Sequence, residues 1–221
     1  MESPLLLITG DTGTLGSVLV RTALEKGFRV LGISRKDFTP SNPAHIHISA
    51  DVTKDTNTLI ASCIKTYGIP KLVISNVGAF VDEKIENMTS EQIDVLLRTN
   101  ITTPVHILQA LASHYKGTGK SANQSENRSV IFISSAGMDP AVLMEDGRAI
   151  ALYGASKAAL SILAVGASKE FSEFGVRINT IAPPYFTNNE EKTERVAQLC
   201  FKLSEDEAVN GSILRERTPP R

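Results

Sequence analysis

The chain has 221 residues, enough for one large domain that buries roughly 70 to 75% of the surface its unfolded chain exposes. Its composition is ordinary for a globular protein, with 42% hydrophobic residues, 21% charged residues and a net charge of -1. This balance excludes a general electrostatic attraction to nucleic acid or to an anionic membrane, so we expect a small-molecule substrate as the partner.

Strand-like and helical segments alternate along the chain. Strands are predicted at residues 5–9, 29–34, 46–50, 72–77, 129–135 and 176–183, and helices at 14–26, 54–67, 89–99, 103–115, 153–174 and 190–204. Pro104 fits a helix start, and Asn188 or Asn189 fits an N-cap. The alternation predicts a single doubly wound, Rossmann-like α/β domain over residues 1–221, with a parallel sheet of six to seven strands and helices on both faces.

The cysteines and the apolar segments indicate the cellular compartment of the protein. Cys63 and Cys200 lie far apart without metal or redox spacing, which is typical of reduced thiols in an intracellular protein. The apolar run Leu5–Ile8 is too short for a signal peptide, and no run approaches membrane-spanning length. We therefore expect a cytoplasmic protein with no membrane partner.

A glycine-rich loop, "TGDTGTLG", follows the first strand and leads into a helix, with Gly10, Gly13 and Gly16 three residues apart. Glycines at a helix N-terminus let a pyrophosphate approach backbone amides, and the helix dipole favours the anion. The alternative is a tight turn that only packs the helix closely on the strand. Asp11 adds a negative charge to this loop and either faces the phosphates or points to solvent.

The second strand ends in "GISRKD", where an NAD-binding fold would carry an acid for the adenosine ribose. Ser34 and Arg35 stand there instead, with Lys36 after them. A hydroxyl and a guanidinium suit a 2′-phosphate, because the guanidinium fork binds phosphate oxygens in pairs. The strand end favours NADP over NAD.

The helix "ALYGASKAALSILA" places Tyr153 and Lys157 one turn apart on one face. A Tyr-x-x-x-Lys pair also arises by chance, so the pair alone decides nothing. A free phenol has a pKa near 10, and a nearby ammonium would let it exchange a proton more readily at neutral pH.

Taken together, these motifs resemble the short-chain dehydrogenase/reductase family over nearly the whole chain. "TGDTGTLG" is similar to the family's cofactor glycine motif, "ADVT" to its adenine contact, and "SNVG" to its Asn-Asn-Ala-Gly segment. "RTNITTP", "FISSAG" and "VRINTIAPP" match further family segments in the same order. Asp51 as a turn acid, or Asn76 and Asn100 as caps, would explain single markers but not their ordered coincidence.

The resemblance implies a set of site residues. The catalytic set is Asn100, Ser135, Tyr153 and Lys157, with Ser134 as a second candidate serine. The implied cofactor-binding residues are Gly10, Thr12, Gly13, Thr14, Leu15, Gly16, Ser34, Arg35, Asp51, Val52, Asn76, Gly78, Tyr153, Lys157, Pro183 and Thr187. Ser135 would bind the substrate oxygen, Tyr153 would donate a proton to it in reduction, and Asn100 would hold a water between Lys157 and solvent.

The chain departs from the family pattern at its cofactor loop and around the expected pocket. Thr14 replaces a glycine, and the Gly-x-x-Gly-x-x-Gly spacing is closer to the family's extended branch. Ser135 and Tyr153 lie 18 residues apart, which is longer than is usual in the family. We therefore expect the segment between them to bulge beside the pocket. Met138, Val142, Leu143, Met144, Tyr185 and Phe186 are either an apolar pocket or ordinary loop anchors.

The C-terminal part departs as well. Pro184 replaces a glycine, and Thr187 comes one position early for its contact with the carboxamide. The substrate lid after residue 187 is shortened, and the usual terminal Asp-Gly-Gly strand is replaced.

Two further patterns bear on metals and assembly. His45 and His47 share a strand face, but no third ligand is in register, so we expect no metal site. Small residues on the Tyr153 helix suit close helix contact and predict at least a homodimer, with a homotetramer as the alternative: Ala155, Ala158, Ala159, Ala164, Gly166 and Ala167.

The expected activity is NADP-dependent interconversion of a carbonyl and an alcohol on a small, partly apolar substrate, with Tyr153 as general acid/base. The alternatives are a non-redox dehydratase, isomerase or cyclase on the same fold, and a nucleotide-binding sensor.

Overall fold

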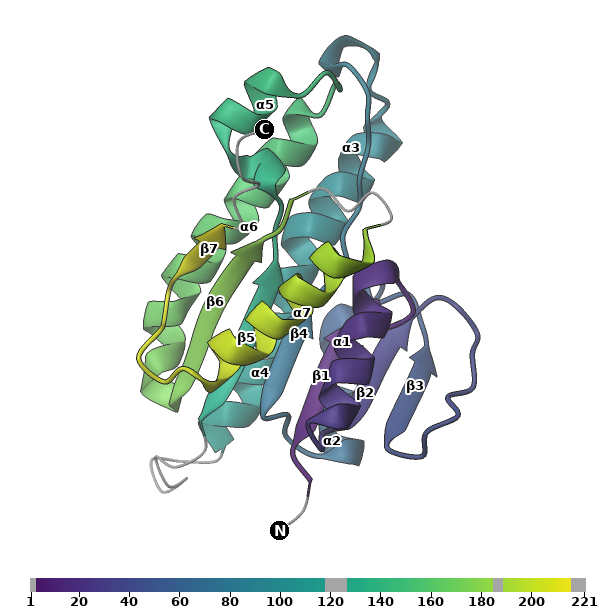
Figure 1. Cartoon of the computed structure of the whole chain (residues 1–221), viewed down its shortest axis with the longest axis vertical. Helices are drawn as coiled ribbons and strands as arrows, with labels where there is room; N and C mark the ends of the chain where they lie inside the picture. Colours follow the sequence, from purple (N-terminus) through teal and green to yellow (C-terminus); the bar gives the residue numbers. More distant parts are fainter. Residues whose placement is uncertain (1–2, 118–126, 185–188, 216–221) are drawn as a thin grey trace.

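A computed structural model describes residues 3–117, 127–184 and 189–215. The strands form one parallel sheet in the order β3-β2-β1-β4-β5-β6-β7, flanked by helices (Figure 1). The strands are β1 Leu5–Thr9, β2 Arg29–Ser34, β3 His45–Ser49, β4 Leu72–Ser75, β5 Arg128–Ile133, β6 Val176–Ala182 and β7 Ile213–Arg215. The predicted doubly wound α/β fold is confirmed.

Helices connect the strands and lie on both faces of the sheet. They are α1 Thr14–Glu25, α2 Thr56–Tyr67, α3 Ser90–Leu97, α4 Thr103–Gly117, α5 Pro140–Glu145, α6 Ala151–Phe171 and α7 Glu190–Glu205. Short 3₁₀ turns span Ile85–Asn87, Ala136–Met138 and Ser172–Phe174. The side chain of Asn189 caps α7 by accepting a hydrogen bond from Lys192 N, which decides between the two predicted caps.

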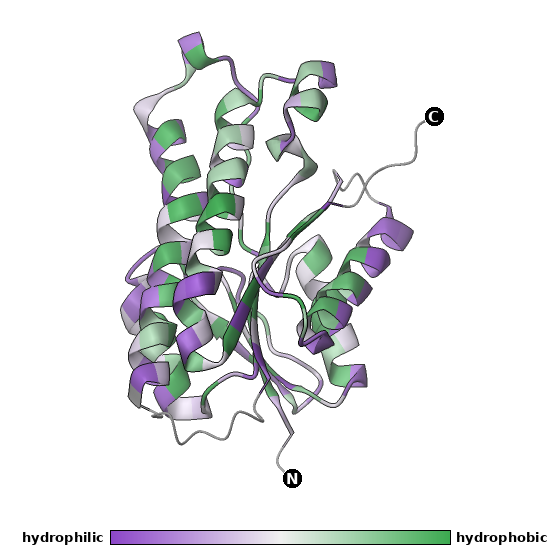
Figure 2. Ribbon diagram, turned by 90° about the vertical axis from the view of Figure 1, so that its left-hand side faces the viewer, coloured by the Kyte–Doolittle hydropathy of each residue, from purple (hydrophilic) through white to green (hydrophobic). Residues whose placement is uncertain are grey.

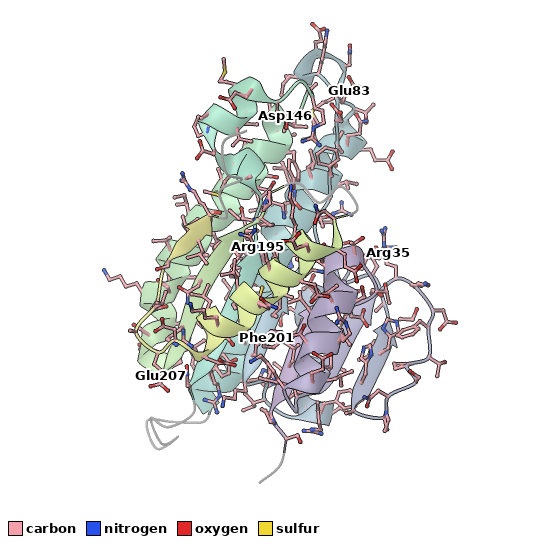
Figure 3. All side chains as sticks on the ribbon, viewed as in Figure 1. Arg35, Glu83, Asp146, Arg195, Phe201 and Glu207 are labelled. Atoms are coloured by element: carbon pink, nitrogen blue, oxygen red, sulfur yellow. The ribbon has the colours of Figure 1, made fainter. Side chains whose placement is uncertain are left out.

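Strand alternation divides the core into two layers. Leu5 and Leu7 of β1 point to the face covered by α2, α4 and α6, whereas Leu6 and Ile8 point to the face covered by α1 and α7. Viewed from the side, apolar residues follow the helix faces turned toward the sheet (Figure 2). Phe201 of α7, labelled in Figure 3, packs on Phe28 with ring centroids 5.9 Å apart.

The order of the strands reverses between β1 and β4. In open α/β sheets, ligands bind beyond the carboxyl ends of the strands at such a reversal. The glycine loop follows β1 and residues 76–79 follow β4, so both lie at this point. The fold therefore brings the predicted cofactor segments together.

The helix from residue 90 to residue 117 is interrupted by a π-helical turn, Arg98–Thr102. Sequence periodicity predicted two separate helices here, with a break before Pro104. A π-turn adds a residue to one turn and turns the following side chains to new directions, and such turns occur frequently at functional sites. Asn100 lies in its middle.

The C-terminal strand corrects one expectation. Although the Asp-Gly-Gly sequence is absent, Ile213–Arg215 still pairs in parallel with β6. Polar side chains hold the connection: Asn179 Oδ1 accepts from Ser212 N at 2.9 Å, and Asn210 Oδ1 accepts from Ile178 N at 2.9 Å. Side-chain amides thus set the strand in place without the family sequence.

The segment from α6 to the turn after it, Ala151–Phe174, is long and apolar enough to cross a membrane by length and composition, contrary to the expectation that no run is. Its buried residues, including Leu160 and Ala164, belong to the core against the sheet. This packing is that of a core helix in an α/β fold, and such a helix passes the same test.

Candidate active site

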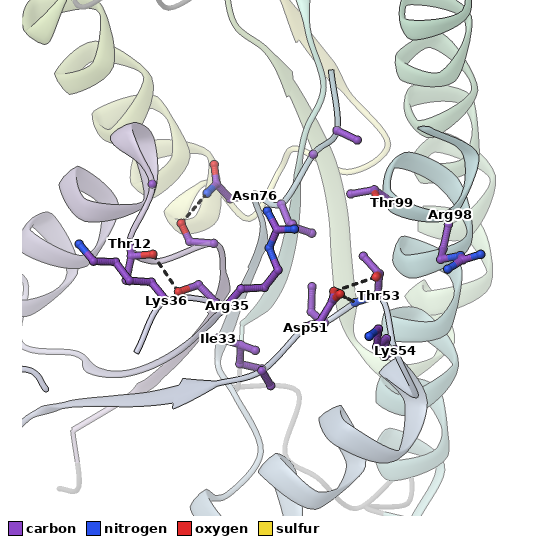
Figure 4. Close-up of a pocket in the computed structure, with 18 of the residues that line it drawn as sticks. Thr12, Ile33, Arg35, Lys36, Asp51, Thr53, Lys54, Asn76, Arg98 and Thr99 are labelled. Atoms are coloured by element: carbon purple, nitrogen blue, oxygen red, sulfur yellow. Dashed lines mark hydrogen bonds between the residues drawn. The ribbon is translucent and has the colours of Figure 1, made fainter. Parts of the chain in front are cut away.

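A cavity of about 760 Å³ lies beyond the carboxyl ends of β1, β2 and β4 (Figure 4). It is lined by nine of the predicted cofactor residues: Gly10, Thr12, Gly13, Ser34, Arg35, Asp51, Val52, Asn76 and Gly78. Ile33, Lys36, Thr53, Lys54, Ala79, Val95, Arg98 and Thr99 line it as well and were not predicted. Most of these are chain neighbours of predicted residues, which is the only signal the sequence carried for them.

The glycine loop has the close backbone packing of a phosphate cradle. Gly10 has a φ of +73°, which favours glycine, and a Cβ at Gly16 would collide with the carbonyl oxygen of Gly10. Gly13 precedes α1 as its N-cap without any side chain over the free amides of the first turn. These residues fit a dinucleotide pyrophosphate at the α1 N-terminus.

The end of β2 borders the same cavity. Ser34 Oγ lies 2.8 Å from Thr12 Oγ1, so the strand end is fastened to the glycine loop. Arg35 projects into the cavity with Asp51 (Figure 4). Burial alone would raise the pKa of Asp51, but hydrogen bonds from Thr53 and the positive charge of Arg35 lower it.

Asp11 takes neither of the directions expected from the sequence. Its side chain is buried and accepts hydrogen bonds from two histidine rings, at 3.1 Å from His45 Nε2 and 2.7 Å from His47 Nδ1. Its charge therefore faces β3 rather than the phosphate cradle or solvent.

A second cavity, about 380 Å³, adjoins the first and shares Asn76, Gly78 and Ala79 with it. Ser135, Tyr153 and Lys157 line it together, although they come from the end of β5 and from α6. Leu15 and Pro183 line this second cavity too. The predicted catalytic side chains thus converge beside the predicted cofactor residues.

The two candidate serines have different surroundings. Ser134 Oγ donates to the backbone carbonyl of Lys157 at 2.9 Å and accepts from Ser161 Oγ at 2.9 Å, so it fastens β5 to α6. Ser135 Oγ accepts from Gly137 N at 3.1 Å, and its hydroxyl lines the same cavity as the Tyr153 phenol and acts to lower the pKa of that phenol. A hydroxyl beside the phenol suits substrate binding, which favours Ser135 over Ser134.

Asn100 is buried behind the cavities and lines neither. Its Nδ2 donates to Ala79 O at 3.0 Å and to Ser156 Oγ at 2.9 Å, and its Oδ1 accepts from Ala79 N at 2.9 Å. The π-turn aims this amide at the 76–79 segment. The contacts assign Asn100 the positioning of that segment against α6.

The pKa of Tyr153 is shifted in the direction opposite to the one that a nearby lysine would produce. Burial raises the pKa of Tyr153, against smaller lowering effects of the Ser135 hydroxyl and of Arg148. The Lys157 ammonium donates a hydrogen bond to the carbonyl oxygen of Ile133 at 2.9 Å. Burial in turn lowers the pKa of Lys157 to about 8.

Two side chains beside Tyr153 were missed. Phe80 packs edge-on against the Tyr153 ring at 4.9 Å between centroids, and Arg148 lies 5.4 Å over the Phe80 ring. Both line the second cavity, as does Pro184. Arg148 comes from the segment between Ser135 and Tyr153, which does stand beside the pocket as expected.

The expected apolar loop cluster does not form one pocket among the described residues. Met144 is 87% exposed, Leu143 packs against Gly154, and Met138 contacts the Ser134 and Ser161 hydroxyls. Of the implied cofactor residues, Thr14 and Gly16 line neither cavity, since Thr14 is exposed and Gly16 packs on Gly10. Thr187, Tyr185 and Phe186 lie outside the described residues.

The family pattern of the short chain dehydrogenases matches residues 4–198. The chain belongs to the short-chain dehydrogenase family. An uncharacterised oxidoreductase of Schizosaccharomyces pombe is 30% identical over 189 residues, which cover 83% of this chain and 67% of that protein. This short-chain dehydrogenase therefore shares its family with oxidoreductases.

Solved structures show the same fold. A short chain dehydrogenase from Leptospira borgpetersenii with bound NAD+ superposes with a TM-score of 0.83 at 21% identity, covering 97% of this chain and 91% of that one. ElxO with bound NADP gives a TM-score of 0.80 at 20% identity, covering 97% of both chains. At these identities the likeness shows the fold of this short-chain dehydrogenase, and the cofactors are those of the two neighbours.

Proposed function

We propose that the protein is an NADP-dependent oxidoreductase that interconverts a carbonyl and an alcohol on a small substrate. The observation that carries the proposal is the placement of the Tyr153 phenol and the Ser135 hydroxyl in one cleft that adjoins the glycine-lined cavity. Neighbours of this fold with bound NAD+ and NADP support a nicotinamide cofactor.

Residues of the first cavity would hold that cofactor. The backbone of Gly10 and Gly13 and the α1 N-terminus suit its pyrophosphate, and Asp51 with Val52 borders the adenine side. When bound, the cofactor supplies or accepts a hydride. Ser34 and Arg35 stand at the end of β2, where a 2′-phosphate would be recognised.

In reduction, the Ser135 hydroxyl donates a hydrogen bond to the substrate carbonyl oxygen, and Tyr153 Oη donates its proton to the same oxygen. A phenol is already protonated at neutral pH, which is the state that a proton donor needs, and burial raises the pKa of Tyr153 further in the same direction. In the reverse direction the phenolate accepts the alcohol proton, which requires higher pH. Near neutral pH Tyr153 is therefore in the protonation state that the reduction step uses.

The walls of the second cavity indicate the substrate. Leu15, Phe80, Pro183 and Pro184 supply apolar surface, and Arg148 adds a cation already paired with Asp146. The volume of about 380 Å³ admits a small molecule. A small, partly apolar carbonyl compound fits this lining.

A screen of small ketones, aldehydes and alcohols, followed at the absorbance band of reduced nicotinamide, tests the activity. Consumption of NADPH with a carbonyl compound, in proportion to alcohol formed, is the expected result. Product without net NADPH consumption would replace the proposal by a dehydratase, isomerase or cyclase. Tight cofactor binding without any product across the screen would favour a nucleotide sensor.

Arg35→Ala tests the cofactor preference. We expect NADPH affinity to fall roughly 10-fold to 100-fold, because one or two charge-assisted hydrogen bonds to the 2′-phosphate are lost. NADH, which lacks that phosphate, is the internal control and should change less than ~3-fold. Fluorescence titration of both nucleotides measures the difference, and equal losses for both would show that Arg35 does not contact the 2′-phosphate.

We also propose a homodimer formed through α6. Ala155, Ala159, Ile162 and Gly166 form an exposed stripe on this helix, with Ile162 67% exposed and open space beside Gly166. Small side chains let two helices approach closely, and an exposed isoleucine among them favours burial. A homotetramer remains the alternative assembly.

Fewer small residues of α6 are exposed than the sequence analysis expected. Ala158 is half-buried, and Ala164 and Ala167 point into the chain's own core. Helix periodicity places them on the sheet side, which composition alone does not reveal.

Ile162→Glu is expected to convert the dimer to a monomer at micromolar concentration, because a carboxylate would be buried at the contact. Light scattering measures the mass. Met144→Glu, at an 87% exposed position on α5, is the matched control and should leave the mass unchanged. A parent protein that is already a monomer would contradict the proposal.

A further inference from the structure

Three metal-ligating side chains meet outside the catalytic cleft. Asp11 follows the first glycine of the loop, and His45 and His47 come from β3. Their ligand atoms lie within 4.8 Å of one another, and the side chains are at most 6% exposed. The Asp11 carboxylate is the third metal-ligating group, which the sequence analysis did not find because Asp11 lies outside the strand that carries the two histidines.

The backbone makes room for this carboxylate. A Cβ at Gly32 would collide with Asp11 Oδ2, and Gly32 pairs with His47 across β2 and β3. His45 and His47 are two residues apart, so their rings stand on the same face of β3. Only a glycine at position 32 lets the Asp11 carboxylate lie over β2 against both rings.

Both ring nitrogens of His47 lie beside oxygen atoms that accept hydrogen bonds. Its Nε2 lies 2.8 Å from the carbonyl oxygen of Lys36, and its Nδ1 lies 2.7 Å from Asp11 Oδ2. Both partners accept hydrogen bonds, but a neutral imidazole has only one N–H. With Nε2–H donating to Lys36 O, a metal ion between Nδ1 and the carboxylate would satisfy both of these groups.

The other end of the carboxylate is unsatisfied as well. Asp11 Oδ1 is buried and has no hydrogen-bond partner among the described residues. An unpaired buried carboxylate oxygen is costly, and a metal or its bound water would satisfy it.

From these contacts we propose that Asp11, His45 and His47 form a site for a divalent transition metal of the zinc class. Two imidazoles and one carboxylate suit Zn²⁺ and not Mg²⁺ or Ca²⁺, which take mainly oxygen ligands. Tetrahedral Zn²⁺ spaces its ligand atoms about 3.3 Å apart. The present spacings of 3.1 Å and 2.7 Å to Asp11 Oδ2 approach that value, so a small outward movement admits the ion.

Further contacts match a zinc site. Zinc-bound histidines commonly donate their other N–H to a backbone carbonyl, as His47 Nε2 does to Lys36. A cavity of about 590 Å³, lined by Asp11, His45, Arg21 and Lys36 among others, reaches the cluster and gives access for the ion and a bound water. The described residues thus provide three ligands, an outer hydrogen bond and an entry path.

The ion would have a structural role. It joins the glycine loop to β3, and through His47 it holds the backbone at Lys36, next to Ser34 and Arg35. Metal binding adds its free energy to that of the folded state. The proposal is independent of the activity, since its tests use the protein without nucleotide or substrate.

The first test is a titration of the full chain, freed of metal by a chelator, with Zn²⁺ and separately with Mg²⁺. We expect one Zn²⁺ per chain, a rise in Tm with Zn²⁺ and none with Mg²⁺. Absence of Zn²⁺ binding would overturn the proposal and leave the Asp11, His45 and His47 cluster as a set of hydrogen-bonded side chains.

Variants and spectroscopy locate the site. His47→Gln and Asp11→Asn should each weaken Zn²⁺ binding at least ~10-fold, because each variant loses one of the three ligands. His106→Gln removes a histidine from α4 and should bind as the parent does. If the ligand variants do not fold, X-ray absorption of the parent with Zn²⁺ decides: a nitrogen and oxygen shell supports the site, and a sulfur shell contradicts it.

Discussion

Tyr153→Phe is expected to lower turnover by at least ~10²-fold, and by as much as ~10⁴-fold, because it removes the group that donates the proton to the substrate oxygen. The ring stays, so its edge-on packing against Phe80 is kept. Cofactor affinity should stay within ~2-fold of the parent, as the phenol oxygen is one contact among many. Steady-state rates on a substrate found in the screen, together with NADPH titration, measure both effects.

Tyr67→Phe is the matched control. Tyr67 is half-buried on α2 and lines neither cavity, so loss of its hydroxyl should leave turnover unchanged. A folded Tyr153→Phe protein that binds NADPH and turns over at the parent rate would remove Tyr153 from the mechanism. A fall in Tm with no change in rate would assign the tyrosine a structural role instead.

Much of the fold was predictable because local patterns and topology agree. The apolar strand segments and amphipathic helices place the predicted elements within about three residues of their positions, although α5 and β7 were not placed, and parallel order brings the carboxyl ends of β1 and β4 together. Gly10, Asn76 and Gly78 follow those strands directly. Their meeting at the cavity is therefore a consequence of strand order.

Contacts that join distant segments were harder to predict. Phe80 is separated from Arg148 and Tyr153 by a long stretch of chain, and only tertiary packing brings it to them. The distinction between Ser134 and Ser135 depends on which way each side chain leaves the end of β5, which no spacing rule determines. The predicted sheet of six to seven strands allowed for a C-terminal strand but did not place it, because Asn179 and Asn210 hold that strand by side-chain hydrogen bonds without the usual sequence.

The histidine cluster shows the same limit. His45 and His47 were visible as a pair on one face of a strand, but Asp11 lies 34 residues before His45 and belongs to the glycine loop after β1. Its direction is set by the space over Gly32, which is a property of the packed sheet. A glycine on a central strand beside a histidine was the one sequence signal for it.

Lys157→Met should abolish measurable turnover and at the same time stabilise the protein at neutral pH. The ammonium is buried, and its environment lowers its pKa from 10.5 to about 8. Folding at pH 7 must therefore remove a charge from water, and among the described residues the Ile133 carbonyl is the group that accepts a hydrogen bond from it. Methionine has a similar length and no charge, so it fills the same space without that cost.

The pH dependence follows from the same two pKa values. Below pH 8 the lysine is protonated in both folded and unfolded chains, and the cost of burying the charge is fully present. Between pH 8 and 10.5 the unfolded chain binds more protons, so the stability of the parent rises with pH. The advantage of Lys157→Met should thus be largest at pH 7, by up to about 3 kcal/mol, and shrink toward pH 10.5.

Urea denaturation of parent and variant at pH 7 and at pH 10 measures this difference, in which all other titrating groups cancel. Lys169→Met, at an exposed lysine on the same helix, should keep the parent's turnover and serves as control. NADPH affinity of Lys157→Met should also fall, because a cation is lost from the cleft that adjoins the cofactor cavity. A Lys157→Met protein that is less stable than the parent at pH 7 would show that the lysine supports the fold, whereas loss of turnover with gained stability shows that the buried charge is kept for catalysis.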